Sequence, residues 1–404
     1  MKTTPLSLCS LAMLGWTFQL TAFSQNQIYT MHEWGTFTTV MGSDGTHLDG
    51  VEREDAPLPK FVYQLDDLHP VNDGTTKGLD YSRTLSHVNV RMETPVIYFY
   101  TDQAFDAQVD VEFIGGTIGQ WFPDRSGGEP WPQERILDFA SKRTGSIRWN
   151  VRVEPAGEDQ FERVFQGGEL PCWLHPRQTD SALVTNARGQ TDKYLFYRGL
   201  GRLDLPLACS ATNVVLKASS KGPEAIEQWL VFELNEQHEA RWWVPETLAP
   251  GTDQSVNLTS QSFRADWKKI LYQDGLKFLM KAGLYRKEAD AMLQTWWNDY
   301  FGKPGLRVFW LVPGAYLEKV LPLHISPTPS QSARVMVGRA EILTPAFEKR
   351  LSDDFAQVDT GRPNPWQEDR FFPAYANRVL QLRATVETKS AELAAPSVPL
   401  QSSN

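Results

Sequence analysis

The chain has 404 residues, of which 41% are hydrophobic and 22% are charged, and its formal net charge at pH 7 is -9. These proportions are typical of a globular protein with one large domain or two domains, and they exclude a disordered chain. The negative charge argues against non-specific binding to nucleic acid or to an anionic membrane surface. The 14 Trp, 12 Tyr and 21 Phe residues suit stacking against carbohydrate, and equally suit a thick β core.

Residues 1–24 have the features of a secretory signal peptide. Lys2 provides the positive amino-terminal region, residues 6–20 are mostly apolar, and residues 22–24 have the small-x-small form of a cleavage site. The apolar run is short for a membrane span, and no later segment is long enough to be one. The sequence therefore predicts a secreted or periplasmic protein whose mature chain begins near Gln25 and has no transmembrane segment.

Residues 25–255 are predicted to form a β-rich, sandwich-like domain of antiparallel sheets. Many short apolar or alternating segments are separated by Gly, Pro and Asp, which is typical of such a fold. The longest expected strands are residues 28–40 and 87–101. The others are residues 109–113, 147–153, 194–197, 214–216, 229–234 and 240–244.

Residues 256–388 are predicted to form an α+β portion that contains a helical hairpin. The hairpin helices are expected at residues 263–279 and 289–300, strands at 306–312 and 334–343, and a last helix at 373–388. Because the two strands could join the sheets of the preceding portion, the two portions are either separate domains or share one core. Residues 389–404 are expected to form a disordered tail.

Cys172 and Cys209 are the two cysteines that remain once the predicted signal peptide is removed. An oxidising compartment permits a disulfide bond between them, and closing a loop of this length would stabilise the fold by roughly 4 kcal/mol. We therefore expect a Cys172–Cys209 bridge, with two separate buried thiols as the alternative. The absence of a Cys-x-x-Cys motif excludes a zinc ribbon, a thioredoxin motif and a c-type haem.

The strand expected at residues 28–40 contains a His-Glu-Trp-Gly run that a half-buried strand does not need. In a strand, His32 and Trp34 share one face while Glu33 points to the other. Histidine is a metal ligand or general base near neutral pH, so His32 and Glu33 are candidate catalytic residues and Trp34 is a candidate binding residue. In the structural alternative, His32 hydrogen-bonds across a sheet and Glu33 pairs with an arginine.

The strand expected at residues 87–101 places His87, Asn89, Arg91 and Glu93 on one face. Four polar groups in a row usually form a solvated face. In the alternative, they form the wall of a cleft in which Glu93 is a catalytic acid or base and Arg91 contacts an anion or a sugar hydroxyl. His87 and Asn89 are then binding residues.

These two strands are predicted to be neighbours that build one site. Taking a carboxylate from water is costly unless it is paired, so Glu33 and Glu93 should each have a cationic or metal partner. Arg91 is the nearest cationic candidate by sequence. If the site is functional, His32→Ala or Glu93→Gln should abolish binding or activity while changing stability by less than about 1 kcal/mol.

No cofactor follows from a sequence motif. His32 and Glu33 begin like the zinc motif His-Glu-x-x-His, but position 36 is threonine, and a strand cannot place the two required side chains together. His32, His87 and Glu93 remain candidate ligands of an unidentified metal. The acidic loop at residues 42–55 carries oxygen ligands of the kind that Ca²⁺ prefers, but without EF-hand spacing, so a solvated loop is the ordinary interpretation.

Three blocks of sequence resemble a group of secreted bacterial proteins that are largely uncharacterised. The blocks are His-Glu-Trp-Gly-Thr-Phe-Thr at residues 32–38, Arg-Met-Glu-Thr-Pro-Val-Ile-Tyr-Phe-Tyr at 91–100 and Gly-Arg-Ala-Glu-Ile-Leu-Thr-Pro at 338–345. Their spread suggests that the resemblance covers most of the mature chain. It implies export, and it implies neither an activity nor a catalytic residue.

Export, negative charge and aromatic content together favour an exported protein that binds or processes a glycan or an envelope polymer. A metal-dependent secreted enzyme that uses His32 with His87 or Glu93 is the second interpretation. A structural envelope protein without a small-molecule site is the third. The expected partner is a glycan or envelope component and not a nucleic acid, while the reaction, if any, and the oligomeric state stay open.

Overall fold

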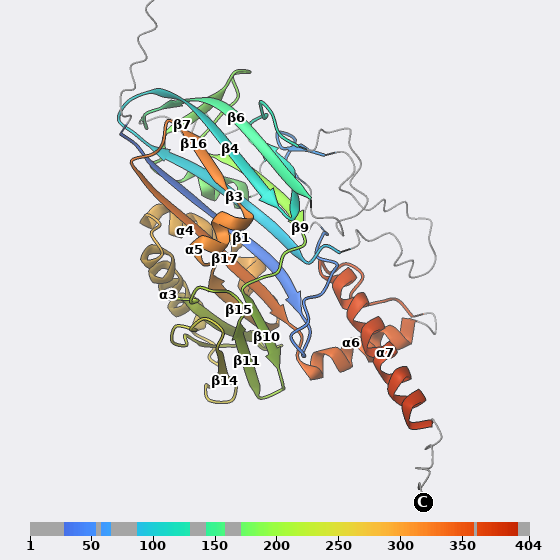
Figure 1. The fold of residues 1–404 in the computed structure, drawn as a ribbon. Coiled ribbons are helices and arrows are strands. Elements are labelled where there is room, and N and C mark those ends of the chain that lie inside the picture. The colour runs from blue at the N-terminus through green and yellow to red at the C-terminus, as the bar shows by residue number, and fades with distance from the viewer. Residues whose placement is uncertain are drawn as a thin grey trace, which may run out of the picture.

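A computed structural model describes residues 28–53, 58–65, 87–129, 143–157, 171–358 and 362–394 of the protein. The predicted signal peptide lies outside these residues, as does the end of the predicted tail from residue 395. The described chain is mainly β, with most of its helices in the C-terminal half (Figure 1). The predicted fold class is therefore confirmed. No helix within the described ranges has the length and apolar character needed to span a membrane.

Most strands belong to one large mixed sheet with the order β13-β12-β15-β17-β1-β3-β9-β5-β6-β4-β16. The strands of this order are β1 (Thr30–Met41), β3 (Val90–Tyr100), β4 (Phe105–Ile114), β5 (Gly116–Phe122), β6 (Thr144–Glu154), β9 (Leu195–Gly201), β12 (Trp229–Leu234), β13 (Ala240–Trp243), β15 (Gly305–Leu311), β16 (Leu323–Ser326) and β17 (Gln331–Ile342). Shorter strands at its margins are β2 (Tyr63–Gln64), β7 (Leu183–Asn186) and β8 (Thr191–Asp192). A separate small sheet contains β10 (Leu207–Ala211), β11 (Val215–Ser220) and β14 (Asp253–Asn257).

Strand β1 lies in the middle of the large sheet and is buried on both faces. It pairs in parallel with β17 and antiparallel with β3. The residues from Met31 to Met41 are all buried, which explains why this segment alternates apolar residues with small or paired polar ones. Since β15 and β17 come from the C-terminal portion, strands from both predicted portions share one sheet and contribute to the same cores.

The sheet folds back over its own centre beyond β9, so that β4 and β6 cover β1 and β3 (Figure 1). The rings of Phe37 and Phe113 stack with their centroids 6.4 Å apart, and those of Tyr29 and Phe105 lie 4.6 Å apart. The burial of every second residue along β6 matches the alternation in its sequence. A hydrophobic core fills the space between the two layers and gives the fold its sandwich-like character.

The other face of the sheet is covered by the predicted helical hairpin, formed by α3 (Trp267–Lys281) and α4 (Arg286–Phe301). A second core lies between them, with Trp34, Phe309 and Val337 contributed by the sheet and Trp296 by α4. The remaining helices are α2 (Pro171–Leu174), the 3-10 helix η2 (His175–Arg177), α5 (Gly314–Val320), α6 (Pro345–Val358) and α7 (Phe372–Ala394). Because α7 continues to Ala394, the first part of the predicted disordered tail is helical.

The predicted Cys172–Cys209 disulfide is wrong, because both cysteines are free thiols. Cys209 in β10 is buried in the core on the side of the large sheet away from the hairpin, whereas Cys172 in α2 packs against the core beneath the hairpin. The two side chains therefore belong to opposite faces of the large sheet. Burial raises the pKa of each thiol, most strongly for Cys209, so both are protonated near neutral pH.

Candidate functional site

The two strands predicted to build one site are neighbours, but their candidate side chains do not meet. In the pairing of β1 with β3, Thr36 lies opposite Glu93, and His32 lies opposite Tyr98. This register offsets His32 from Glu93 by four residues along β1, or about 13 Å at about 3.3 Å per residue. The prediction of a shared site is therefore wrong, and the candidate residues belong to separate clusters.

The His32 cluster joins the sheet to the start of helix α4. The Nδ1 atom of His32 lies 2.7 Å from Oε2 of Glu288, and the hydroxyl of Tyr100 donates to Oε1 of the same carboxylate at 2.8 Å. The backbone N–H of Tyr285 also donates to Oε2, at 2.7 Å. Glu288 is fully buried, so one carboxylate holds β1, β3 and the first turn of α4 together. These contacts give His32 a structural role.

Sequence reasoning missed Glu288, which contributes the carboxylate of the His32 cluster. Glu288 is the third residue of α4, the position at which a glutamate bonds back to the backbone before a helix. This capping pattern was the signal that could have identified it. Nothing in the sequence paired it with His32, because the two residues are distant in the chain.

Glu33 points to the opposite face of the sheet and is fully buried there. Arg334 of β17, its register partner, donates from Nε to Oε2 at 2.7 Å, and the hydroxyl of Tyr197 donates to Oε1 at 2.5 Å. The expected pairing of Glu33 with a cation is confirmed, and the cation is an arginine. Although burial lowers the pKa of Arg334, the adjacent Glu33 carboxylate outweighs this effect and holds the pKa well above its ordinary value.

Trp34, His87 and Asn89 do not form a binding surface. Trp34 is 0% exposed beneath the hairpin, so the prediction that it contacts a ligand is wrong. His87 lies in a turn before β3 with φ of 68°, and its Nδ1 is 3.6 Å from Oδ2 of Asp49. The Asn89 side chain bonds both backbone polar groups of Leu203, at 2.9 and 3.1 Å, which ties two loops together.

The predicted metal ligands His32, His87 and Glu93 therefore lie in three different surroundings, and that prediction is corrected. Among the residues that the structure describes, no group of three His, Cys, Asp or Glu side chains could hold a metal ion. In the acidic loop, Asp44 pairs with Arg378 at 3.0 Å and Asp49 with Arg202 at 2.7 Å. Residues 54 and 55 of that loop lie outside the described residues.

Glu93 is the centre of a buried charged cluster at the other end of β1. Its carboxylate forms ion pairs with Arg370 and, at 3.2 Å, with Nε of Arg91, which confirms the expected cationic partner. The hydroxyl of Thr38 donates to Oε2 at 2.7 Å. Burial raises the pKa of Glu93, but Arg370, Arg91 and Arg339 together outweigh it and lower the pKa to about 2. Glu93 is therefore ionised, which excludes it as a general acid at neutral pH.

A second buried carboxylate, Glu341, continues this cluster on β17. Arg307 donates from Nε to Oε1 of Glu341 at 2.7 Å, and Arg339 donates from Nη2 to the same oxygen. Burial raises the pKa of Glu341, but the guanidinium groups of Arg307 and Arg339 lower it by a larger amount. The pKa of Glu341 is therefore below its ordinary value. The cluster thus combines the buried residues Arg91, Arg307, Arg339 and Arg370 with Glu93 and Glu341.

Four members of this cluster, Arg307, Arg339, Glu341 and Arg370, line a pocket of about 330 Å³, which we call the arginine pocket. The floor consists of Arg307 and Arg339 of the sheet with Arg370 of the C-terminal segment. The end of α4 also lines the pocket, as do α6, α7 and residues 366–371. The aromatic residues that line the pocket are Phe347, Trp366, Phe371 and Tyr375.

Arg339 has hydrogen-bond donors that the protein leaves unused. Its Nε and Nη1 atoms are buried and have no partner in the described part of the chain. Its guanidinium carbon lies 5.2 Å from the ring centroid of Tyr300 and 5.6 Å from that of Phe371, so the group is held between two rings. A buried charged donor without a partner is costly, and an acceptor supplied by a ligand would remove that cost.

The acidic groups at the mouth of the pocket are mostly neutralised by other residues. Glu233 pairs with Arg241 at 2.8 Å, Glu236 with Arg350 at 3.0 Å and Asp369 with Lys303 at 3.4 Å. Asp299 also lines the pocket and makes no ion pair with any described residue. The pocket therefore has an excess of positive charge at its floor and a hydrogen-bond acceptor at its mouth.

Sequence reasoning identified only part of the buried charged cluster beside the arginine pocket. Arg91 and Glu93 were candidates, whereas Arg307, Arg339 and Arg370 were not. The sequence held one signal for the missed residues, which is an arginine inside an otherwise apolar strand. Arg307 within residues 306–312 is an example. Such a residue requires a buried partner, but the sequence does not say which one.

No protein-family model matches the chain, and no curated protein matches it. Among solved structures, one match is a yeast structure described as the delta-COP-I mu-homology domain complexed with a Dsl1 WxWxV peptide. The match has 7% sequence identity and a TM-score of 0.28, and it covers 78% of this chain and 97% of that chain. A likeness at this level carries no argument about function.

Proposed function

We propose that the protein is exported and binds an acidic sugar unit of a glycan or envelope polymer in the arginine pocket. The observation that carries this proposal is the pair of buried, unpartnered donors on Arg339. Nη2 of Arg339 is already bonded to Glu341, and Nε and Nη1 point to different sides of the guanidinium, so each can donate a separate charge-assisted hydrogen bond to a ligand oxygen. Carboxylate oxygens are strong acceptors of such bonds from arginine. The bound carboxylate would also offset the excess positive charge of the floor.

The remainder of the pocket supports a sugar acid over a simple anion. The rings of Phe347 and Trp366, whose centroids are 5.2 Å apart, offer apolar faces to a sugar ring. Asp299 offers a carboxylate oxygen that can accept a hydrogen bond from a sugar hydroxyl. A small inorganic anion would use the guanidinium donors and leave both features without a contact.

Binding is tested by titration calorimetry with a trimer of galacturonic acid, with the neutral galactose trimer as comparison. We expect the acidic trimer to bind and the neutral trimer to bind more weakly. Arg339→Met should weaken binding of the acidic trimer by about 10- to 150-fold, since a hydrogen bond to a charged group contributes about 1.5–3 kcal/mol. Arg152→Met, which changes an exposed arginine of β6, is the matched control and should leave the affinity unchanged.

Equal affinity for the two trimers, or an unchanged affinity in Arg339→Met, would contradict the proposal. Binding of sulfate alone would identify the pocket as a site for a simple anion. Thermal melts of each variant separate a loss of binding from a loss of folded protein. If Arg339→Met does not fold, the proposal is decided by comparing the affinities of the unchanged protein for the acidic and the neutral trimer.

Export rests on the signal-like residues 1–24 and on the resemblance to secreted bacterial proteins. We expect the mature protein to begin near Gln25, because signal peptidase would cut after the small-x-small segment. Amino-terminal sequencing of protein recovered from outside the cytoplasm measures this directly. An intact Met1 on all of the folded protein would refute export without affecting the sugar-binding measurement.

A further inference from the structure

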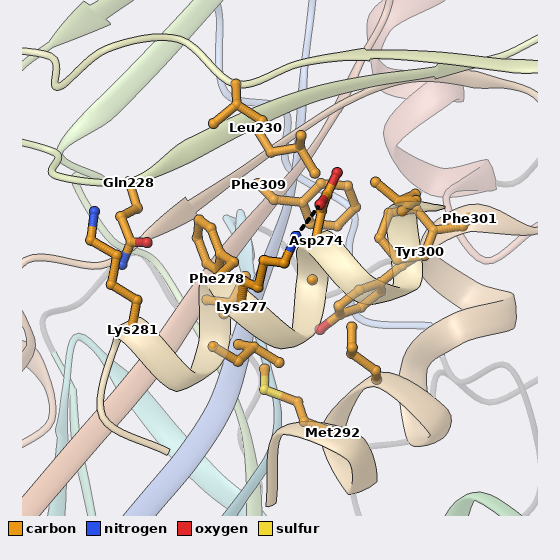
Figure 2. Close-up of a pocket in the computed structure, with 16 residues that line it drawn as sticks. Gln228, Leu230, Asp274, Lys277, Phe278, Lys281, Met292, Tyr300, Phe301 and Phe309 are labelled. Carbon is orange, nitrogen blue, oxygen red and sulfur yellow. Dashed lines mark hydrogen bonds and ion pairs between the residues drawn. The ribbon is translucent and has the colours of Figure 1, made fainter. Parts of the chain in front are cut away.

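A second cavity, of about 370 Å³, lies between the helical hairpin and strands β12, β15 and β17 (Figure 2). This size is within the usual range for small-molecule sites, roughly 300–1,000 Å³. Its walls are almost entirely apolar, with Leu230 and Phe309 from the sheet and Phe278, Met292 and Phe301 from the hairpin. We call it the hairpin cavity.

The charged side chains that line the hairpin cavity all belong to α3, which forms one edge of it. Figure 2 shows Lys281 beside Gln228, and Lys277 reaching toward Asp274. Lys277 pairs with Asp274 at 3.4 Å, whereas Lys281 makes no ion pair within the described residues. The edge therefore has one ammonium group in excess over carboxylates. Val244, which is 69% exposed, also lines the cavity and marks where it opens to solvent.

The interior offers little to a polar ligand. Tyr300 lines the cavity, but its hydroxyl is already bonded to Thr36. A polar group placed inside would lose its bonds to water without gaining a partner, which costs free energy. A peptide strand or a sugar is therefore disfavoured, whereas an alkyl chain gains from every methylene that it buries.

We propose that the hairpin cavity binds a linear alkyl chain with an anionic head group, in the manner of a fatty acid. The chain lies among the apolar side chains between the hairpin and the sheet. The head group remains at the edge, where Lys281 neutralises it and water still reaches it. This site is separate from the arginine pocket and does not depend on the function proposed for that pocket.

Calorimetric titration of the delipidated, full mature protein with octanoate, decanoate and dodecanoate tests the alkyl part. The dissociation constant should fall by about fourfold for each added methylene until the cavity is full, as expected for burial of the chain. Leu230→Trp should abolish binding by filling the cavity from β12, where Leu230 is only partly buried. Leu230→Met is the volume-matched control and should retain binding.

Dodecan-1-ol tests the head group, because it carries the same chain without a charge. Dodecanoate should bind about fivefold or more tightly than the alcohol, and Lys281→Gln should remove this preference. Lys269→Gln is the matched control, since Lys269 is an exposed residue of α3 outside the cavity. The galacturonic acid trimer should not compete with dodecanoate for the unchanged protein, which separates this proposal from that for the arginine pocket.

Three results would overturn the proposal. The first is the absence of dodecanoate binding, the second is an affinity independent of chain length, and the third is equal binding of acid and alcohol. Each variant must melt at the wild-type temperature before its affinity is compared with that of the unchanged protein. The titrations with unchanged protein remain decisive even where Leu230→Trp does not fold.

Discussion

Glu93→Gln is expected to destabilise the protein by about 3–5 kcal/mol, the usual cost of removing one partner from a buried ion pair. The substitution keeps the shape of the side chain but removes the charge that neutralises Arg91 and Arg370. Both guanidinium groups would stay buried beside Arg339, which increases their mutual repulsion. Urea unfolding, followed by tryptophan fluorescence, measures the change in the free energy of unfolding.

The matched control is Asp106→Asn, which removes a carboxylate from an exposed pair. Asp106 lies 3.2 Å from Arg152, and its side chain is 83% exposed, so the expected loss is within about 0.5 kcal/mol. A loss below about 1 kcal/mol for Glu93→Gln would agree with the expectation from sequence and contradict the role assigned here. That expectation assumed a site apart from the core, whereas Glu93 is only 2% exposed.

The pH dependence of stability tests the role of the Glu93 carboxylate independently. The pKa of Glu93 falls from its ordinary value of 4.5 to about 2 in the folded protein. A depressed folded pKa means that the unfolded chain takes up the proton first. The contribution of Glu93 is therefore complete above about pH 4.5 and is lost as the pH falls toward 2. Glu93→Gln should lack this part of the acid dependence, while Asp106→Asn should retain it.

Gly338→Ala is expected to destabilise the protein by about 3 kcal/mol or more, at the upper end of the usual cost of overpacking a core. Gly338 of β17 lies directly opposite Trp310 of β15. A Cβ atom at this glycine would be 2.0 Å from Cε2 of the Trp310 ring, and that ring is fully buried. The ring cannot move without displacing the core on its other side.

Gly314→Ala is the control for a glycine that has space, because no atom lies within 4 Å of the added methyl group. Thermal melts of the two variants should differ clearly, with Gly314→Ala close to the unchanged protein. Gly338→Ala combined with Trp310→Leu should cost less than the sum of the two single substitutions, and the double-mutant cycle measures this coupling. A Gly338→Ala protein that melts at the wild-type temperature would contradict the steric explanation.

The sequence alone predicted the elements whose periodicity is strong. The central strand β1, the alternating strand β6 and the helical hairpin all follow from local spacing of apolar residues, and all are present. It also predicted that Glu33 and Glu93 need cationic partners, because a buried carboxylate is costly anywhere in a protein. The sequence identified a correct partner only for Glu93. That partner is Arg91, which lies two residues away in the chain.

The tertiary structure alone decided which distant groups meet. Sheet order places β17 beside β1, and this brings Arg334 to Glu33 and Arg339 into the buried charged cluster around Glu93. The packing of the small sheet and of α2 puts Cys209 and Cys172 in different cores, which no spacing of cysteines can reveal. Local patterns determine whether a segment becomes a strand and which side chains share a face. Pairing between strands depends instead on the packing of the whole core, so the partners of buried charges become visible only in the folded chain.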